Sequence, residues 1–369
     1  MAGADGRFAW FGEGVKGLVV LAVIGLIAFG AAKLGLAPKP EDIKDPQNWP
    51  LWAAVVLVFA AYQFGWPHLT RAWRRWRVPS AAPGKISVVL AQLHEDNSNR
   101  ALRETVREAI VAQLGEAVEV ILWPESLRVG DGRHAEADAD AQRQAQKWLK
   151  SKSCDLLVWG RVKGDKTLAL RFTPAAGPGS DMRSYGLTSE TLELPANFVS
   201  HLGAAVAARI VVEAAPAVDM SGHYLVPLMR RTAERLAPVI ETLNPAFDAD
   251  TRGSLFFSYA LVKATIGEQA GSNDDLRQAV TAYRDALQEK TRERVPLQWA
   301  MTQNNLGTAL TSLGERESGT AHLAEAVTAF GEALAIFEAA SADRYVRGTR
   351  QNLARAQALI AKRQIQVAP

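Results

Sequence analysis

The chain has one cysteine, few histidines and little net charge, and each shortage excludes a class of protein. The single Cys154 excludes an intramolecular disulfide and any cysteine-rich zinc site. The six histidines show no metal-ligand spacing, and a formal charge of +3 over 369 residues argues against a dedicated nucleic-acid binder. Cys154 begins the apolar run CDLLVW, which favours a small buried hydrophobic side chain over a reactive thiol.

The sequence also lacks a recognisable catalytic centre. No Ser/His/Asp order stands out, and the segment AAGPGSD (175–181) lacks the Lys-Ser/Thr of a P-loop, so it reads as a turn. In HEDNSN (94–99), His94 and Glu95 could do acid–base chemistry. The simpler interpretation is that Asn97 or Ser98 caps the following helix while the acidic residues complement its dipole. We therefore expect no enzyme, no cofactor and no metal.

Two long apolar runs near the amino terminus predict membrane helices at 17–36 and 50–66. About 20 apolar residues suffice to cross the hydrocarbon layer. The loop 37–49 joins the two runs, and tryptophans mark the ends of the second, as is typical of the membrane interface. A cleaved signal peptide is the alternative, but it would leave the second run unexplained.

A basic segment with interleaved tryptophans follows the second run, within the linker 67–85. Because Lys and Arg next to membrane helices favour the cytoplasmic side, we expect the tail 1–16 and all later domains to be cytoplasmic and the loop to be external. The reverse topology is the alternative for this orientation, and a nucleic-acid patch is the alternative for the basic segment. We expect this segment to lie on anionic headgroups of the bilayer. Its predicted membrane-surface residues are Arg71, Arg74, Arg75, Arg77, Trp73 and Trp76.

The periodicity then changes and predicts a small α/β domain over 86–215. Expected strands are 86–91, 118–123, 154–162 and 166–174, with a further edge strand at 189–195; expected helices are 99–115, 135–151 and 197–215. This order implies right-handed crossovers and a partly parallel, mixed sheet. The order of elements and the strand-final WGRV (159–162) resemble the amino-terminal α/β domain of TolB, which implies binding and assembly rather than catalysis.

The last third of the chain matches itself after a shift of 47 residues. AVTAYRDAL (279–287) falls on AVTAFGEAL (326–334), and NNLG (304–307) falls on QNLA (351–354). A repeat of this length predicts a solenoid of helix pairs, in which small residues let helices approach and Tyr283 or Phe330 fills the space between them. Helices at 225–243 and 347–364 are expected to cap the two ends.

The phrase RERVPLQWAMTQNNLGTAL resembles bacterial tetratricopeptide-repeat (TPR) proteins with enlarged, kinesin-light-chain-like repeats, although the links are longer than in the standard repeat. The resemblance implies a concave groove for a protein partner or for self-association. Asn304 would hold an extended backbone and Arg355 a carboxylate. The alternative for each position is ordinary helix packing. The implied groove residues are Phe257, Leu261, Met301, Asn304, Thr308, Gln351 and Arg355.

These observations together predict a multidomain α + α/β chain. It would comprise a two-helix transmembrane hairpin, a small α/β sandwich-like domain with a mixed sheet, and a carboxyl-terminal TPR-type α-solenoid over 216–369. The predicted function is a non-enzymatic scaffold or adaptor at a bacterial inner membrane, with a protein partner and without nucleic acid. Two rivals stay open: a membrane-bound sensor whose α/β domain binds a small ligand at 94–99, and an enzyme that uses His94 and Glu95.

Overall fold

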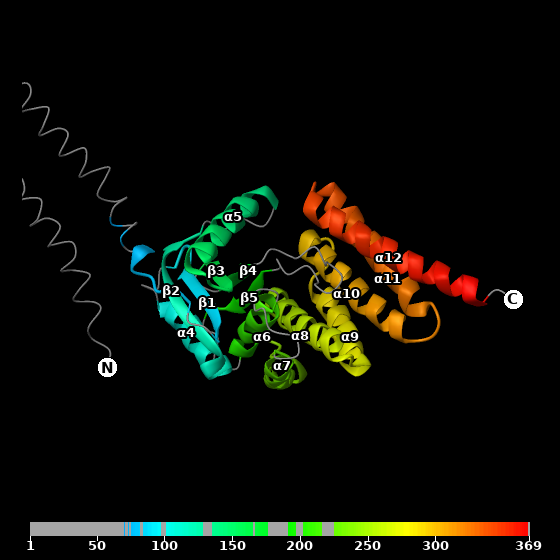
Figure 1. Cartoon of the computed structure of the whole chain (residues 1–369), viewed down its shortest axis with the longest axis horizontal. Coiled ribbons are helices and arrows are strands. Elements are labelled where there is room, and N and C mark those ends of the chain that lie inside the picture. Colours follow the sequence, from blue (N-terminus) through cyan, green and yellow to red (C-terminus); the bar gives the residue numbers. More distant parts are fainter. Residues whose placement is uncertain are drawn as a thin grey trace, which may run out of the picture. The chain divides into compact units, whose positions relative to one another are not determined.

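A computed structural model describes most of the chain beyond the predicted membrane segment (Figure 1). The predicted tail, membrane helices and loop (1–66) lie outside the described part, as do Arg71, Arg74, Asn97 and Ser98. No helix within the described ranges has both the length and the hydrophobicity that a membrane span requires. The described residues are 70, 73, 75–81, 84–96, 101–127, 135–164, 167–175, 191–196, 202–215 and 225–367.

Five strands of the described residues form one mixed sheet in the order β2-β1-β3-β4-β5. β1 (Ile86–Gln92) pairs in parallel with β2 (Val118–Ser126) and with β3 (Leu156–Lys163). β4 (Thr167–Pro174) and β5 (Leu192–Pro195) then add by antiparallel pairing. The structure therefore confirms the predicted mixed sheet, the β3–β4 hairpin and the edge position of the last strand.

Helices cover both faces of this sheet because each central strand is apolar on both sides. Val88 and Leu90 of β1 face the core shared with α4 (Ala101–Leu114) and α6 (Gly203–Ala214). Val89 and Ala91 face the opposite core, formed with α5 (Ala135–Lys152), where Trp123 and Trp148 stack at 5.0 Å. A short 3-10 helix, η4 (Gly115–Ala117), links α4 to β2. The predicted α/β layering is thus confirmed.

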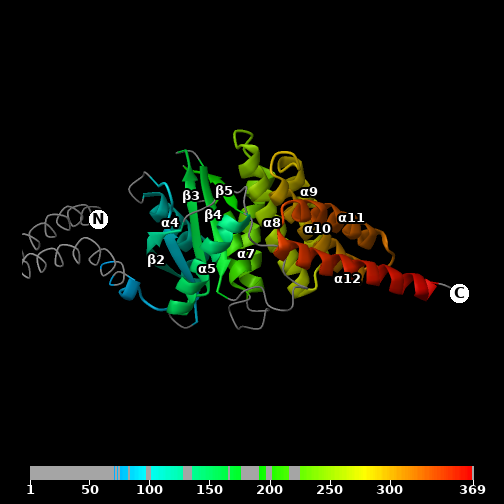
Figure 2. The same ribbon diagram turned by 90° about the horizontal axis from the view of Figure 1, so that it is seen from above.

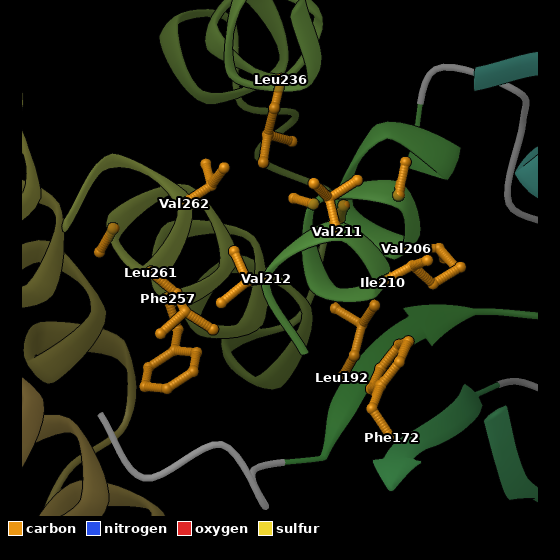
Figure 3. Packing of buried hydrophobic residues seen from close by; sticks show 14 of the residues in the cluster. Phe172, Leu192, Val206, Ile210, Val211, Val212, Leu236, Phe257, Leu261 and Val262 are labelled. Carbon is orange, nitrogen blue, oxygen red and sulfur yellow. The ribbon is translucent and has the colours of Figure 1, made fainter. Parts of the chain in front are cut away.

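Helix α6 is buried on every side, and this burial joins the sheet to the helices that follow. All twelve of its residues are buried between the sheet, α7 (Val226–Glu241) and α8 (Ala249–Ala270). Figure 3 shows Ile210 near Phe172 and Leu192 of the sheet, while Val212 of the same helix lies toward Leu261 of α8. The predicted boundary at 215/216 therefore lies between two helices that share one hydrophobic core.

The helices after α7 form successive antiparallel pairs that follow one another away from the sheet (Figures 1 and 2). The first pair is α8 with α9 (Asn273–Glu289), and the second is α10 (Pro296–Arg316) with α11 (Ala321–Ala339). α12 (Asp343–Val367) packs on α11 and α10. Local signals set the ends: Asp248 and Ser272 cap α8 and α9, and Gly271 ends α8 with a left-handed φ of 71°.

Candidate protein-interaction site

Glycine at fixed positions lets the two helices of each pair approach closely. An ideal Cβ built on Gly307 of α10 would lie 2.7 Å from the Phe330 ring of α11, closer than carbon atoms pack. Gly314 stands 2.6 Å, by the same measure, from Leu323. In the first pair, Gly267 approaches Leu276 at the equivalent 2.6 Å. The 47-residue repeat in the sequence is therefore a repeat of helix-to-helix contacts.

The predicted groove residues divide into a buried majority and an accessible minority. Phe257, Leu261, Met301, Asn304 and Thr308 are all buried within the helical packing. Gln351 is exposed and Arg355 is half-buried, both on α12. The packing alternative therefore describes the first five residues in this structure, because none of them offers its side chain to a partner. A role in binding stays a prediction for Gln351 and Arg355.

Asn304 joins two helices of the chain instead of presenting a free amide. Its Oδ1 accepts hydrogen bonds from Thr349 Oγ1 at 3.0 Å and from Asn352 Nδ2 at 3.4 Å, both on α12. Arg355 is likewise engaged, since it donates to the Glu315 carboxylate at 2.8 Å. The two side chains to which the family resemblance assigns partner recognition thus hold α12 against α10.

An arginine repeated at 47 residues binds the end of the preceding first helix. Arg316 Nη1 donates to the carbonyl of Gly267 at 2.9 Å, and Arg363 donates to the carbonyl of Gly314 and to that of Glu317 at 2.8 Å. The last carbonyls of a helix have no partner within the helix, so a cation there is stabilising. We did not predict this contact; the spacing of the two arginines was the signal for it.

A carboxylate lies between the first helices of neighbouring pairs. Glu268 of α8 accepts a hydrogen bond from Ser312 Oγ of α10 at 3.1 Å. Burial raises the pKa of Glu268 to about 8, although Ser312 and the nearby Arg355 and Arg316 act in the opposite direction. The raised pKa favours the protonated form of this side chain, so we expect the contact between the pairs to depend on pH.

Buried charges concentrate where α6 meets the first helix pair. Arg209 and Glu213, both about 1 % exposed, form an ion pair of 3.0 Å one turn apart on α6. The guanidinium of Arg209 and the amine of Lys290 lie 5.4 and 5.6 Å from the centroid of the same Phe257 ring. Burial lowers the pKa of Lys290 well below its usual value, and the positive charges of Arg294 and Lys163 add to the effect. No periodicity in the sequence indicated these groups.

His94 and Glu95 follow β1 at the carboxyl ends of the parallel strands, as predicted. His94 Nε2 and Glu95 Oε1 are 3.8 Å apart, and the backbone of His94 extends the pairing with β3 through Gly160 and Val162. Glu95 has a φ of 59°, which is uncommon for a residue with a side chain. Within the described ranges, no three His, Cys, Asp or Glu side chains gather in a way that could hold a metal.

Cys154 is buried beside α5, as predicted. Burial, together with the negative charges of Asp155 and Glu119, raises the pKa of its thiol to about 11. The thiolate, which is the reactive form of cysteine, is therefore scarce at neutral pH. The residue behaves as a small hydrophobic side chain of the core around Trp159.

Part of the predicted membrane-surface segment is described. Trp73 and Trp76 are 53 % and 78 % exposed, which is unusual for such large apolar side chains. Arg75 instead binds Glu125 of β2 through two hydrogen bonds of 3.0 and 2.7 Å. Arg75 itself is therefore bound to the sheet, and contact of Arg77 and the two tryptophans with a bilayer stays a prediction.

Comparisons with known protein families, with curated proteins and with solved structures found no match to this chain. The resemblances to TPR proteins and to the TolB domain therefore rest on the sequence motifs alone. What the chain does has to be argued from its own geometry: repeated helix pairs, buried polar contacts between them, and an accessible last helix.

Proposed function

We propose that this protein is a membrane-anchored scaffold or adaptor that presents a TPR-like helical stack to a protein partner. The observation that carries the proposal is the repeat of contacts at 47 residues, with Gly314 against Leu323 and Gly267 against Leu276. Stacks of such helix pairs expose long surfaces, and repeat proteins use these surfaces to bind other proteins. The α/β unit shares its core with the stack and gives it a rigid base.

The anchoring part of the proposal rests on the sequence. The apolar runs 17–36 and 50–66 have the composition of two membrane helices, followed by the basic, tryptophan-containing segment. We expect the soluble parts to be cytoplasmic. Reporter fusions at residues 45 and 369 test this topology: periplasmic reporter activity at residue 369 would overturn it, and recovery of the full chain in the soluble fraction would overturn the anchor itself.

The scaffold function is tested by capture of partners from the host with the full tagged chain. Gly307→Leu places a large side chain against Phe330 and disrupts the stack, whereas Gly331→Leu puts the same side chain on α11 where a Cβ meets no atom within 4 Å. We expect Gly307→Leu to lose proteins that both the wild type and Gly331→Leu retain. An identical set of proteins on all three baits would contradict a scaffold function of the stack.

One observation favours a second candidate, a sensor that binds a small ligand near His94. β1 is flanked by parallel strands on both sides, and ligands of open α/β sheets bind beyond the carboxyl ends of such strands. The left-handed φ of Glu95 lies at this place. If a ligand binds there, it raises the melting temperature of the wild type more than that of His94→Ala.

A further inference from the structure

The last helix presents a continuous exposed face, which we call the α12 face. Its residues follow one another at steps of four and three along the helix, so they share one side. All six are exposed, and Ile365 at the end is 76 % exposed, which is a large apolar surface for a single side chain. The α12 face comprises Arg347, Gln351, Ala354, Ala358, Ala361 and Ile365.

The same positions are covered by a helix in the preceding repeat. Subtracting 47 places Ala354 on Gly307 and Ala361 on Gly314. Those two glycines of α10 pack closely against Phe330 and Leu323 of α11, respectively. In the first pair the position of Ala361 corresponds to Gly267, which holds Leu276 of α9. The chain therefore shows twice what packs on this side of a first helix: an antiparallel amphipathic helix. Within the described residues no helix covers it on α12.

The charge of α12 identifies the kind of helix that fits. α12 carries six Arg or Lys and one Asp, a formal charge of +5. The helices that cover the equivalent faces are acidic: α11 has three Glu and no Lys or Arg (−3), and α9 has four acids and two Arg (−2). In both pairs an acidic residue of the second helix binds the first helix, Glu289 to Arg252 at 2.7 Å and Glu332 to Gln303 at 2.7 Å.

Basic residues remain at the edge of the face for such a partner. Arg350 and Arg355 are paired with Glu338 and Glu315 of the chain. Arg344, Arg347 and Lys362, in contrast, form no ion pair with any residue that the structure describes. A second copy of α12 would bring the same positive charges to the face, so self-association here is disfavoured by repulsion.

The size of the face residues also limits the partner. Both earlier equivalents of Ala361 are glycine, and a Cβ at Gly314 would lie 2.6 Å from Leu323. A helix seated on α12 at the same distance must carry a side chain smaller than leucine opposite Ala361. α11 of a second copy, whose own apolar side is already buried, does not meet this requirement.

We infer that the α12 face binds an acidic amphipathic helix of another protein, seated antiparallel as α11 is on α10 and completing the third helix pair. The inference rests on the proposed function, because it names the surface and the class of partner of the scaffold. Apolar contact with Ala354, Ala358 and Ile365 supplies affinity, and the basic residues at the edge select negative charge.

A peptide derived from the chain itself is the probe. It contains residues 320–340 with Leu323→Ala and Phe330→Ala, so that it carries three Glu and fits against both Ala361 and Ala354. We expect the purified full chain in detergent to bind this peptide in a fluorescence anisotropy titration. Ala358→Glu should weaken binding by about tenfold or more, since it places a like charge in the centre of the contact. Ala335→Glu, a matched change at an exposed alanine of α11, should leave it unchanged.

A charge exchange separates the acidic partner from other occupants. The triple variant Arg344→Glu, Arg347→Glu, Lys362→Glu should lose the acidic peptide and bind a version in which the three Glu are replaced by Lys. Equal affinity of Ala358→Glu and Ala335→Glu, or no binding of the peptide, overturns the inference. The inference is also overturned if Ala358→Glu leaves peptide binding unchanged but abolishes binding to phosphatidylcholine–phosphatidylserine vesicles. The same holds if it leaves peptide binding unchanged but abolishes dimerisation measured by sedimentation.

The two proposals fail in different ways. Partner capture that is lost with Gly307→Leu but retained with Ala358→Glu supports the scaffold and overturns the role of the α12 face. Capture that is unaffected by Gly307→Leu overturns the scaffold, whatever the peptide does.

Discussion

Lys290 occupies in the first helix pair the position that Phe337 occupies in the second, 47 residues later in the chain. Both side chains are completely buried. The aliphatic stem of Lys290 lies against Gly253, where an added Cβ would meet its Cγ at 2.7 Å, and the second pair has Ala300 at the place of that glycine. The lysine stem therefore fills the space of an aromatic ring, and the smaller residue opposite makes room for it.

The first prediction is that Lys290→Met is more stable than the wild type at pH 7. Methionine fills a similar volume without a group whose charged form burial disfavours. Because the folded-state pKa is lowered, the unfolded chain binds a proton that the folded chain does not, so this residue makes stability rise with pH up to the unfolded value near about 10.4. The advantage of Lys290→Met should shrink between pH 7 and pH 10 in urea denaturation.

Lys362→Met is the control, since this lysine is exposed on α12. It should change stability little and equally at both pH values. A Lys290→Met variant that is less stable than the wild type at pH 7, with no change of the difference by pH 10, would show that the amine is held in its charged form by the surrounding groups.

The second prediction compares two glycines one helix apart. Gly307→Ala puts a Cβ 2.7 Å from Phe330 and should destabilise the protein by about 1–3 kcal/mol, the usual cost of overpacking. Gly331→Ala lies in the middle of exposed α11 surface with no atom in reach and should stabilise by about 0.5–1 kcal/mol through helix propensity. Chemical denaturation measures both, and equal effects would contradict the close approach of α10 and α11.

The repeat in the sequence made the contacts between the two helices of a pair predictable. The accessibility of the groove could not be predicted from it. Gly314 and Leu323 recur 47 residues apart as Gly267 and Leu276, so their packing is encoded locally in the sequence. The burial of Asn304 depends on how near α12 comes to α10, which no pattern within α10 states. From Ala300 to Gly314, α10 is buried all round, although it contains many polar residues. These positions of α10 would line an open groove if the first helices of neighbouring pairs were further apart. In this structure they lie in the interior.

The burial of the charged pair on α6 was also not predictable from the sequence, because it depends on packing between separate elements. Arg209 and Glu213 lie in an apolar stretch that correctly predicts an inward-facing helix. Their side chains would ordinarily be assigned to a solvent-exposed side, but the packing of α6 between the sheet and α8 buries them. The strands were predictable because β1 and β3 are continuous apolar runs, which are typical of a sheet covered on both faces.

The third prediction concerns Glu268 and pH. Its folded-state pKa, near 8, exceeds that of an unfolded glutamic acid, so the folded protein binds the extra proton. This contribution to stability is complete below the unfolded pKa and is lost as the pH rises through about 8. Ser312, Glu315 and Arg316 of α10 and Arg355 of α12 surround the group.

Glu268→Gln keeps the shape and the hydrogen bond with Ser312 but cannot titrate. We expect the wild type to lose stability relative to Glu268→Gln between pH 5 and pH 9, measured by urea denaturation at each pH. Glu241→Gln serves as the control, because this residue lies at the exposed end of α7. A difference that stays constant over the range would mean that Arg316 and Arg355 keep the Glu268 carboxylate ionised.

The last prediction separates the two members of the buried ion pair on α6. Arg209→Met leaves the Glu213 carboxylate buried without its cation and should cost about 3–5 kcal/mol, the usual loss when one partner of such a pair is removed. The double variant Arg209→Met, Glu213→Leu removes both charges and should recover most of that loss, because two apolar side chains no longer require desolvation of an ion pair. The coupling between Arg209 and Glu213 is measured from the free energies of unfolding of four proteins: the wild type, the two single variants and the double variant. The double variant could instead lose as much stability as the two single variants together. In that case the junction is stabilised by stacking of the Arg209 guanidinium on Phe172 and Phe257, at 5.2 and 5.4 Å, and the ion pair with Glu213 contributes little. Recovery would show that the ion pair is tolerated at the centre of the molecule because its partners satisfy each other, one helical turn apart.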